Sequence, residues 1–129
     1  MNKVVENWIN IAEYDLETAE AMLVTGRYIY VAFMCQQTIE KYLKAKYVSS
    51  TGETPSYTHN LLRLAEISGI DKELNEEQSD FITELNVYYI KARYSEELEK
   101  IKAKLTKNKA SKLFKNTQIL AQWLKAKIK

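Results

Sequence analysis

Residues that break helices are almost absent from this chain, and their scarcity limits the folds open to it more than any other feature. The 129 residues include three Gly and one Pro. Gly and Pro interrupt helices most strongly, whereas the abundant Ala, Leu, Lys and Glu favour helix. No stretch shows a convincing strand pattern. The sequence therefore predicts an all-α fold.

Apolar residues recur at helical spacing in four long segments, at about 2–24, 27–50, 75–94 and 107–128. A short third helix is expected between the second and the 75–94 segment, capped by Ser56 or Thr58 and ending near Gly69. Another helix is expected to start at Ser95, because Glu96 and Glu97 suit a first turn. The length suits one domain, 1–129, so we expect an up-and-down bundle of four long helices with one or two short ones.

The second predicted helix begins with a segment, 28–35, that is apolar on every face. Such a helix is typically central and packed on several sides. Cys35 is the only cysteine, so an internal disulfide is excluded and a buried thiol is expected. The apolar segment is too short to span a membrane, and no secretion signal is visible at the start of the chain. These features predict a cytoplasmic protein.

Basic residues are concentrated in the last quarter of the chain. The net charge is +2, yet residues 100–129 contain ten Lys and no Asp or Glu. This asymmetry indicates either an anionic partner for the last helix or simply the solvated face of a terminal helix.

Several polar residues interrupt the predicted apolar faces, and these are the candidate site residues. Asp15 lies in the same helical row as Trp8 and Ile11, where an unpaired carboxylate would be costly to bury. The others lie where the second helix leaves the core and near the end of the fourth: Gln37, Glu40, Lys41, Lys44, Asn86, Tyr89, Arg93 and Tyr94.

Two interpretations of these residues are open. In the first, Asp15, Glu40 and Arg93 form an internal ion network that fixes helix packing. In the second, a cleft binds the phosphate and base of a nucleotide or RNA through Lys41, Lys44, Arg93, Tyr89 and Tyr94.

His59 is the only histidine, and it opens the predicted third helix after a loop. A histidine in that position usually caps a helix or fixes a loop. It is the one catalytic candidate, but general acid–base chemistry needs a partner that the sequence does not show. No metal-binding motif and no Gly-rich phosphate loop is present, so we expect no metal and no cofactor other than a nucleotide ligand.

Four stretches of sequence together resemble the HEPN domain family (higher eukaryotes and prokaryotes nucleotide-binding). In chain order they are WINIAEYDLETAEAML, YVAFMCQQTIEKYLKAKY, THNLLRLAE and NVYYIKARY, followed by the basic QILAQWLKAKI. The resemblance implies a helical bundle that forms a homodimer. It also implies, as a partner, a minimal nucleotidyltransferase in a toxin–antitoxin-like system, or else a nucleotide or RNA ligand.

The RNase branch of that family uses an Arg followed four to six residues later by His. The Arg residues here are Arg27, Arg63 and Arg93, and His59 follows none of them at that distance. We therefore expect a non-catalytic binding module in which Asp15 and Glu40 orient the basic groups. The alternatives are a divergent RNase toxin and a structural homodimer scaffold.

Overall fold

A computed structural model describes residues 2–91 and 95–129 of the chain, and every regular element in these ranges is helical. The four long helices are α1 (Lys3–Val24), α2 (Tyr28–Thr51), α4 (Glu76–Lys91) and α6 (Lys107–Lys127). The shorter elements are α3 (Leu61–Ile67), a 3₁₀ turn η1 (Ile70–Lys72) and α5 (Ser95–Lys104). The all-α fold with four long helices is confirmed.

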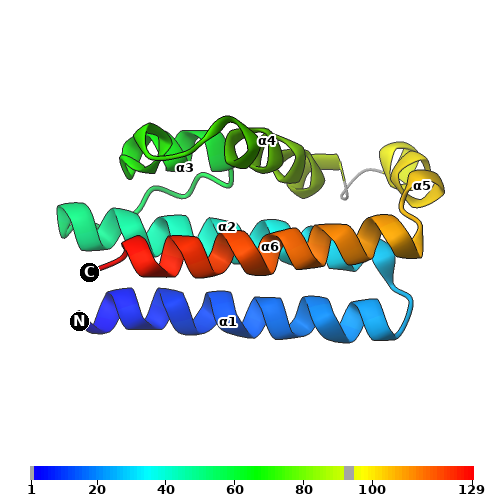
Figure 1. Cartoon of the computed structure of the whole chain (residues 1–129), viewed down its shortest axis with the longest axis horizontal. Coiled ribbons are helices and arrows are strands. Elements are labelled where there is room, and N and C mark those ends of the chain that lie inside the picture. Colours follow the sequence, from blue (N-terminus) through cyan, green and yellow to red (C-terminus); the bar gives the residue numbers. More distant parts are fainter. Residues whose placement is uncertain (1, 92–94) are drawn as a thin grey trace.

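The long helices alternate in direction along the chain, which gives the expected up-and-down bundle (Figure 1). Helix α2 packs against α1, α6, α3 and α4, so it is the central element. Helices α3 and α4 form a layer on the opposite side of α2 and α6 from α1, and α5 lies at one end of the bundle (Figure 1). Because α2 and α6 run the same way, the hydroxyl of Ser49 donates to the carbonyl oxygen of Lys129 at 2.5 Å.

The central position of α2 follows from its sequence. Val31, Ile39, Glu40 and Val48 are all buried, and with about 3.6 residues per turn they are distributed around the whole helix. A helix that buries every face must be covered by neighbours on all sides. The expected burial of the Cys35 thiol is confirmed, and burial raises its pKa to about 12.

Local signals set most of the helix ends. The Asn75 side chain accepts from the backbone N–H of Gln78 at 2.8 Å, and the Gln78 side chain accepts from the Asn75 N–H at 3.0 Å. This reciprocal pair is a capping box. Gly26 ends α1 in the left-handed conformation with φ of 77°, a backbone geometry that glycine adopts without strain.

The predicted cap of the third helix was wrong. Neither Ser56 nor Thr58 caps α3, because the Asn60 side chain accepts from the backbone N–H groups of Leu62 and Arg63 at 3.0 and 3.2 Å. The Thr58 hydroxyl accepts instead from the Asn60 N–H at 3.1 Å. Thr58 therefore forms a local turn before the helix, and the helix begins later than expected.

Candidate functional site

The side chain of Glu40, in the middle of α2, is only 1% exposed. A buried carboxylate is costly unless it is paired and hydrogen-bonded. Its Oε2 atom lies 3.2 Å from Nζ of Lys44 and 4.0 Å from Nζ of Lys41. Its Oε1 atom lies 3.0 Å from Nδ1 of His59. Each oxygen of the carboxylate therefore has at least one nitrogen partner.

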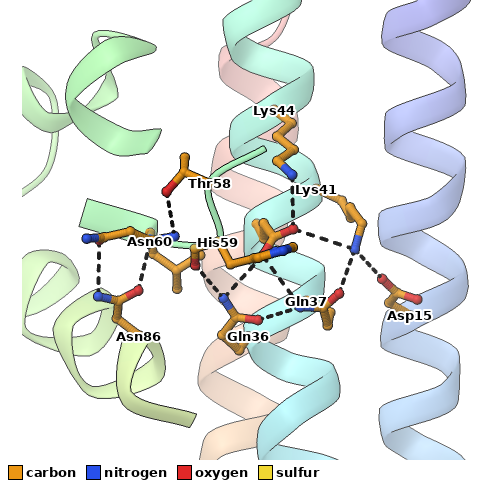
Figure 2. Close-up of polar contacts among 11 residues, drawn as sticks. Asp15, Gln36, Gln37, Lys41, Lys44, Thr58, His59, Asn60 and Asn86 are labelled. Carbon is orange, nitrogen blue, oxygen red and sulfur yellow. Dashed lines mark hydrogen bonds and ion pairs between the residues drawn. The ribbon is translucent and has the colours of Figure 1, made fainter. Parts of the chain in front are cut away.

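Two glutamines of α2 complete the hydrogen bonds around this carboxylate. Gln36 Nε2 lies 3.4 Å from Glu40 Oε1 and donates to the carbonyl oxygen of His59 at 3.0 Å. Gln37 Nε2 donates to Gln36 Oε1 at 2.7 Å, while Gln37 Oε1 accepts from Lys41 Nζ at 2.9 Å. Within the described residues no buried side-chain nitrogen or oxygen lacks a partner. The arrangement is a closed network (Figure 2).

Asp15 connects this network to α1. Its Oδ2 atom lies 3.4 Å from Lys41 Nζ, and both side chains are 15% exposed. Burial raises the pKa of the Asp15 carboxyl, the charge of Lys41 opposes that change, and the nearby Glu40 adds to it. Lys41 therefore bridges a carboxylate on each of two helices, and α1 and α2 are joined by an ion pair as well as by apolar packing.

His59 is the most exposed member of the network. Its side chain is 42% exposed even though Glu40 holds Nδ1. The imidazole stacks on the Tyr89 ring with centroids 4.1 Å apart and an angle of 20° between the planes. The Tyr89 ring in turn lies 6.1 Å from the ring of Phe33. The His59 imidazole is thus fixed in position and orientation while part of it faces solvent.

The backbone next to His59 is fixed from α4. The Asn86 side chain accepts from the Leu61 N–H at 2.7 Å and donates to Asn60 Oδ1 at 3.2 Å. Because Gln36 holds the His59 carbonyl oxygen from α2, side chains of two helices secure the segment from either side (Figure 2).

The structure brings most of the predicted site residues together. Asp15, Gln37, Glu40, Lys41 and Lys44 form one connected network, as the first interpretation expects, but with the two lysines as its cations. To these the loop and α4 add His59, Asn86 and Tyr89. Arg93 and Tyr94 lie outside the described residues. A ligand-binding role for these residues stays a prediction.

Lys44 is more enclosed than a residue lining an open cleft. Its side chain is 7% exposed, its Nζ pairs with Glu40, and the ring of Trp8 lies 5.5 Å away. Lys41 is the more accessible of the two lysines, but it already contacts Asp15, Gln37 and Glu40.

Sequence reasoning missed two contributors, Asn60 and Phe33. Asn60 carried a usable signal, because an Asn directly before an apolar helical run is a preferred cap. Phe33 carried none, since its contact with Tyr89 joins α2 to α4 and depends on how these helices pack.

Within residues 2–91 and 95–129 no group of three or more His, Cys, Asp or Glu side chains is placed to hold a metal ion. No helix in this part of the chain is both long enough and apolar enough to cross a membrane.

Comparison with known proteins identifies the family. The model of the HEPN domain matches residues 5–127, which is nearly the whole chain. No curated protein and no solved structure matches. The chain belongs to the HEPN domain family.

Proposed function

We propose that the chain is a non-catalytic HEPN module that binds a nucleotide at the exposed edge of the Glu40 network. One observation carries the proposal: His59 is held through Nδ1 by a buried carboxylate and stacked on Tyr89, yet 42% of its side chain remains exposed. Membership in a family associated with nucleotide binding and RNases supports this assignment.

The geometry suits recognition of a base. Because Glu40 accepts at Nδ1, the Nε2 atom of His59 is left to form a hydrogen bond with a ligand. An aromatic ring held in place offers a stacking surface, and base–aromatic stacking contributes about 1–3 kcal/mol per base. Lys41, whose side chain is 15% exposed, is the more accessible lysine of the network and would contact a phosphate.

Two observations favour binding without cleavage. The chain has one histidine, which does not follow an arginine by four to six residues. General acid–base cleavage uses a proton acceptor and a proton donor, and both lysines beside Glu40 are already engaged in ion pairs within the network. The charged groups next to His59 therefore stabilise the fold.

A titration read by NMR tests the proposal directly. Since His59 is the only histidine, its imidazole signals need no assignment. AMP, ATP and a short RNA should each be added while the His59 ring signals are followed. We expect a saturable shift in the wild-type protein. Calorimetry, which also reads H59A although that variant has no imidazole signal, should give about tenfold weaker binding in H59A and Y89A, because each removes part of the stacking surface.

Tyr57 provides the matched control, because it lies in the same loop but is 97% exposed. Y57A should bind like the wild-type protein. If the His59 signals stay unmoved at millimolar nucleotide, or if Y57A loses as much affinity as H59A, nucleotide binding at this site is wrong.

A divergent RNase is the second candidate, and the Glu40–His59 pair is the observation that favours it. A carboxylate on Nδ1 orients an imidazole so that Nε2 acts as a base. Incubation of total RNA with the purified wild-type protein, and in parallel with H59A, tests whether the protein cleaves RNA. Cleavage that disappears in H59A would support the enzyme and overturn the non-catalytic assignment.

We also propose that the protein assembles, either as a homodimer or with a nucleotidyltransferase. Val4, Ile11 and Tyr14 on α1 are large apolar side chains exposed on the same helix as Asp15. Clusters of exposed apolar side chains often mark interfaces. Light scattering coupled to size exclusion should give a dimer in which Y14E increases the monomer fraction. A monomer at every concentration would contradict the homodimer.

A further inference from the structure

A second concave region lies between α4, α5 and the start of α6, and His59 does not line it. Its cavity has a volume of about 520 Å³, which lies within the range of small-molecule sites. Its lining comprises Glu84, Val87, Tyr88, Lys100, Ile101, Lys104, Leu105 and Lys109. We call it the α4–α5 groove. Of the predicted site residues that the structure describes, none lines it.

The floor of the groove is apolar. Ile101 and Leu105 belong to the hydrophobic core, and Tyr88 packs against that core. Val87 is 41% exposed, so an apolar side chain on α4 faces the groove without being covered. Apart from the Tyr88 hydroxyl, the floor side chains offer no hydrogen-bonding group. The lining therefore suits the apolar body of a ligand.

The rim is basic, with three lysines against one glutamate. Lys109 pairs with Glu84 at 2.6 Å, and this hydrogen bond is the main cause of the raised pKa of Lys109. Lys104 is exposed and forms no ion pair among the described residues. Its ammonium is therefore available to an anion at the rim.

We propose that the α4–α5 groove binds a small organic anion with an apolar body, such as an aliphatic or aryl carboxylate. The apolar part would contact Val87 and Ile101, and the charged end would lie at Lys104. A nucleotide suits the groove less well, because a base has polar edges that this floor would leave unpaired. The site is thus separate from the proposed nucleotide site in both place and chemistry.

Fluorescence titration with the aryl sulfonate ANS, which carries an apolar ring system and one negative charge, tests the groove. K104E and V87W should each weaken ANS binding by about tenfold or more, the first by reversing the charge and the second by filling the space. K115E is the matched control: Lys115 is exposed on α6, outside the groove and without an ion pair among the described residues. The affinity of K115E for ANS should equal that of the wild-type protein.

Competition then identifies the ligand class. Decanoate should displace ANS, whereas AMP at the same concentration should not. Any one of three results would overturn the proposal: equal ANS affinity in K104E and K115E, unchanged ANS affinity in V87W, or displacement of ANS by AMP as effectively as by decanoate. H59A should leave ANS binding intact, so failure of the nucleotide site and failure of the groove are distinguishable. Urea midpoints close to wild type for K104E and V87W show that both variants are folded.

Discussion

Neutralising the Glu40 carboxylate should be among the most destabilising polar substitutions in this protein. Glu40 is 1% exposed, and Lys44, whose Nζ lies 3.2 Å away, is 7% exposed. In E40Q the Lys44 ammonium keeps the Trp8 ring at 5.5 Å but loses its counter-charge. Lys41 keeps its ion pair with Asp15 in this variant. Breaking a buried pair costs about 3–5 kcal/mol, mostly because the remaining charge stays buried.

The chain contains a matched control at the same distance. Glu13 and Lys125 also lie 3.2 Å apart, but their side chains are 45% and 52% exposed. Exposed ion pairs contribute less than about 1 kcal/mol, so E13Q should lower the free energy of unfolding far less than E40Q. The two substitutions are chemically identical, and burial is the main difference between the pairs.

Urea unfolding followed by circular dichroism measures these differences, and a double variant separates pairing from packing. E40L/K44M removes both charges and keeps apolar volume. Replacing a buried pair in this way is often neutral or stabilising, so the double variant should be more stable than E40L alone. If E40Q costs no more than E13Q, or if E40L/K44M is as unstable as E40L, the desolvation argument is refuted.

Three further outcomes follow from individual groups. In the neutral form of His59 the ¹⁵N spectrum should show the ring proton on Nδ1, because the Glu40 carboxylate accepts a hydrogen bond from that atom; a ring protonated on Nε2 would contradict the structure. Burial and the charge of Glu13 raise the pKa of Tyr42 to about 12 from 10.0. The folded state therefore holds the phenol proton that the unfolded chain releases. The free energy of unfolding should therefore fall by roughly 1–3 kcal/mol as pH rises from 10 towards 12. In Y42F this fall should be smaller, as measured from urea unfolding curves at a series of pH values. The buried Cys35, whose pKa burial raises to about 12, should react with a thiol reagent only after unfolding; rapid reaction of the native protein would show that the thiol is accessible.

The fold was predictable because the information that sets it is local. Helical periodicity placed the four long helices, and two of their ends are formed by features local in the sequence, the capping box at Asn75 and the glycine at Gly26. The error at the start of α3 came from the same local chemistry. Thr58 and Asn60 are both competent caps, and only the folded backbone shows that the Thr58 hydroxyl is used two residues later in a turn.

The members of the site were more predictable than its pairings. Spacing placed Glu40, Lys41 and Lys44 at the boundary of the core, and the cost of burial indicated that Asp15 needs a partner. Spacing could not show that Lys41 reaches from α2 to α1, because that distance depends on interhelical packing. The loop before α3 likewise brings His59 onto Glu40, nineteen residues earlier in the chain. No pattern along one helix contains that contact.

The balance of charge in the network determines how the two proposed sites should respond to salt. Asp15 and Glu40 offset Lys41 and Lys44, so within the described residues the network has little net charge with which to attract an anion. Affinity at His59 must then come mainly from stacking and hydrogen bonds, which salt screens weakly. The rim of the α4–α5 groove has an excess of lysine, and its exposed charges are screened over about 10 Å at 0.1 M salt. Raising the salt concentration should therefore weaken ANS binding markedly and AMP binding only slightly. An equally steep salt dependence for AMP would show that lysines, rather than the His59–Tyr89 stack, supply its binding energy.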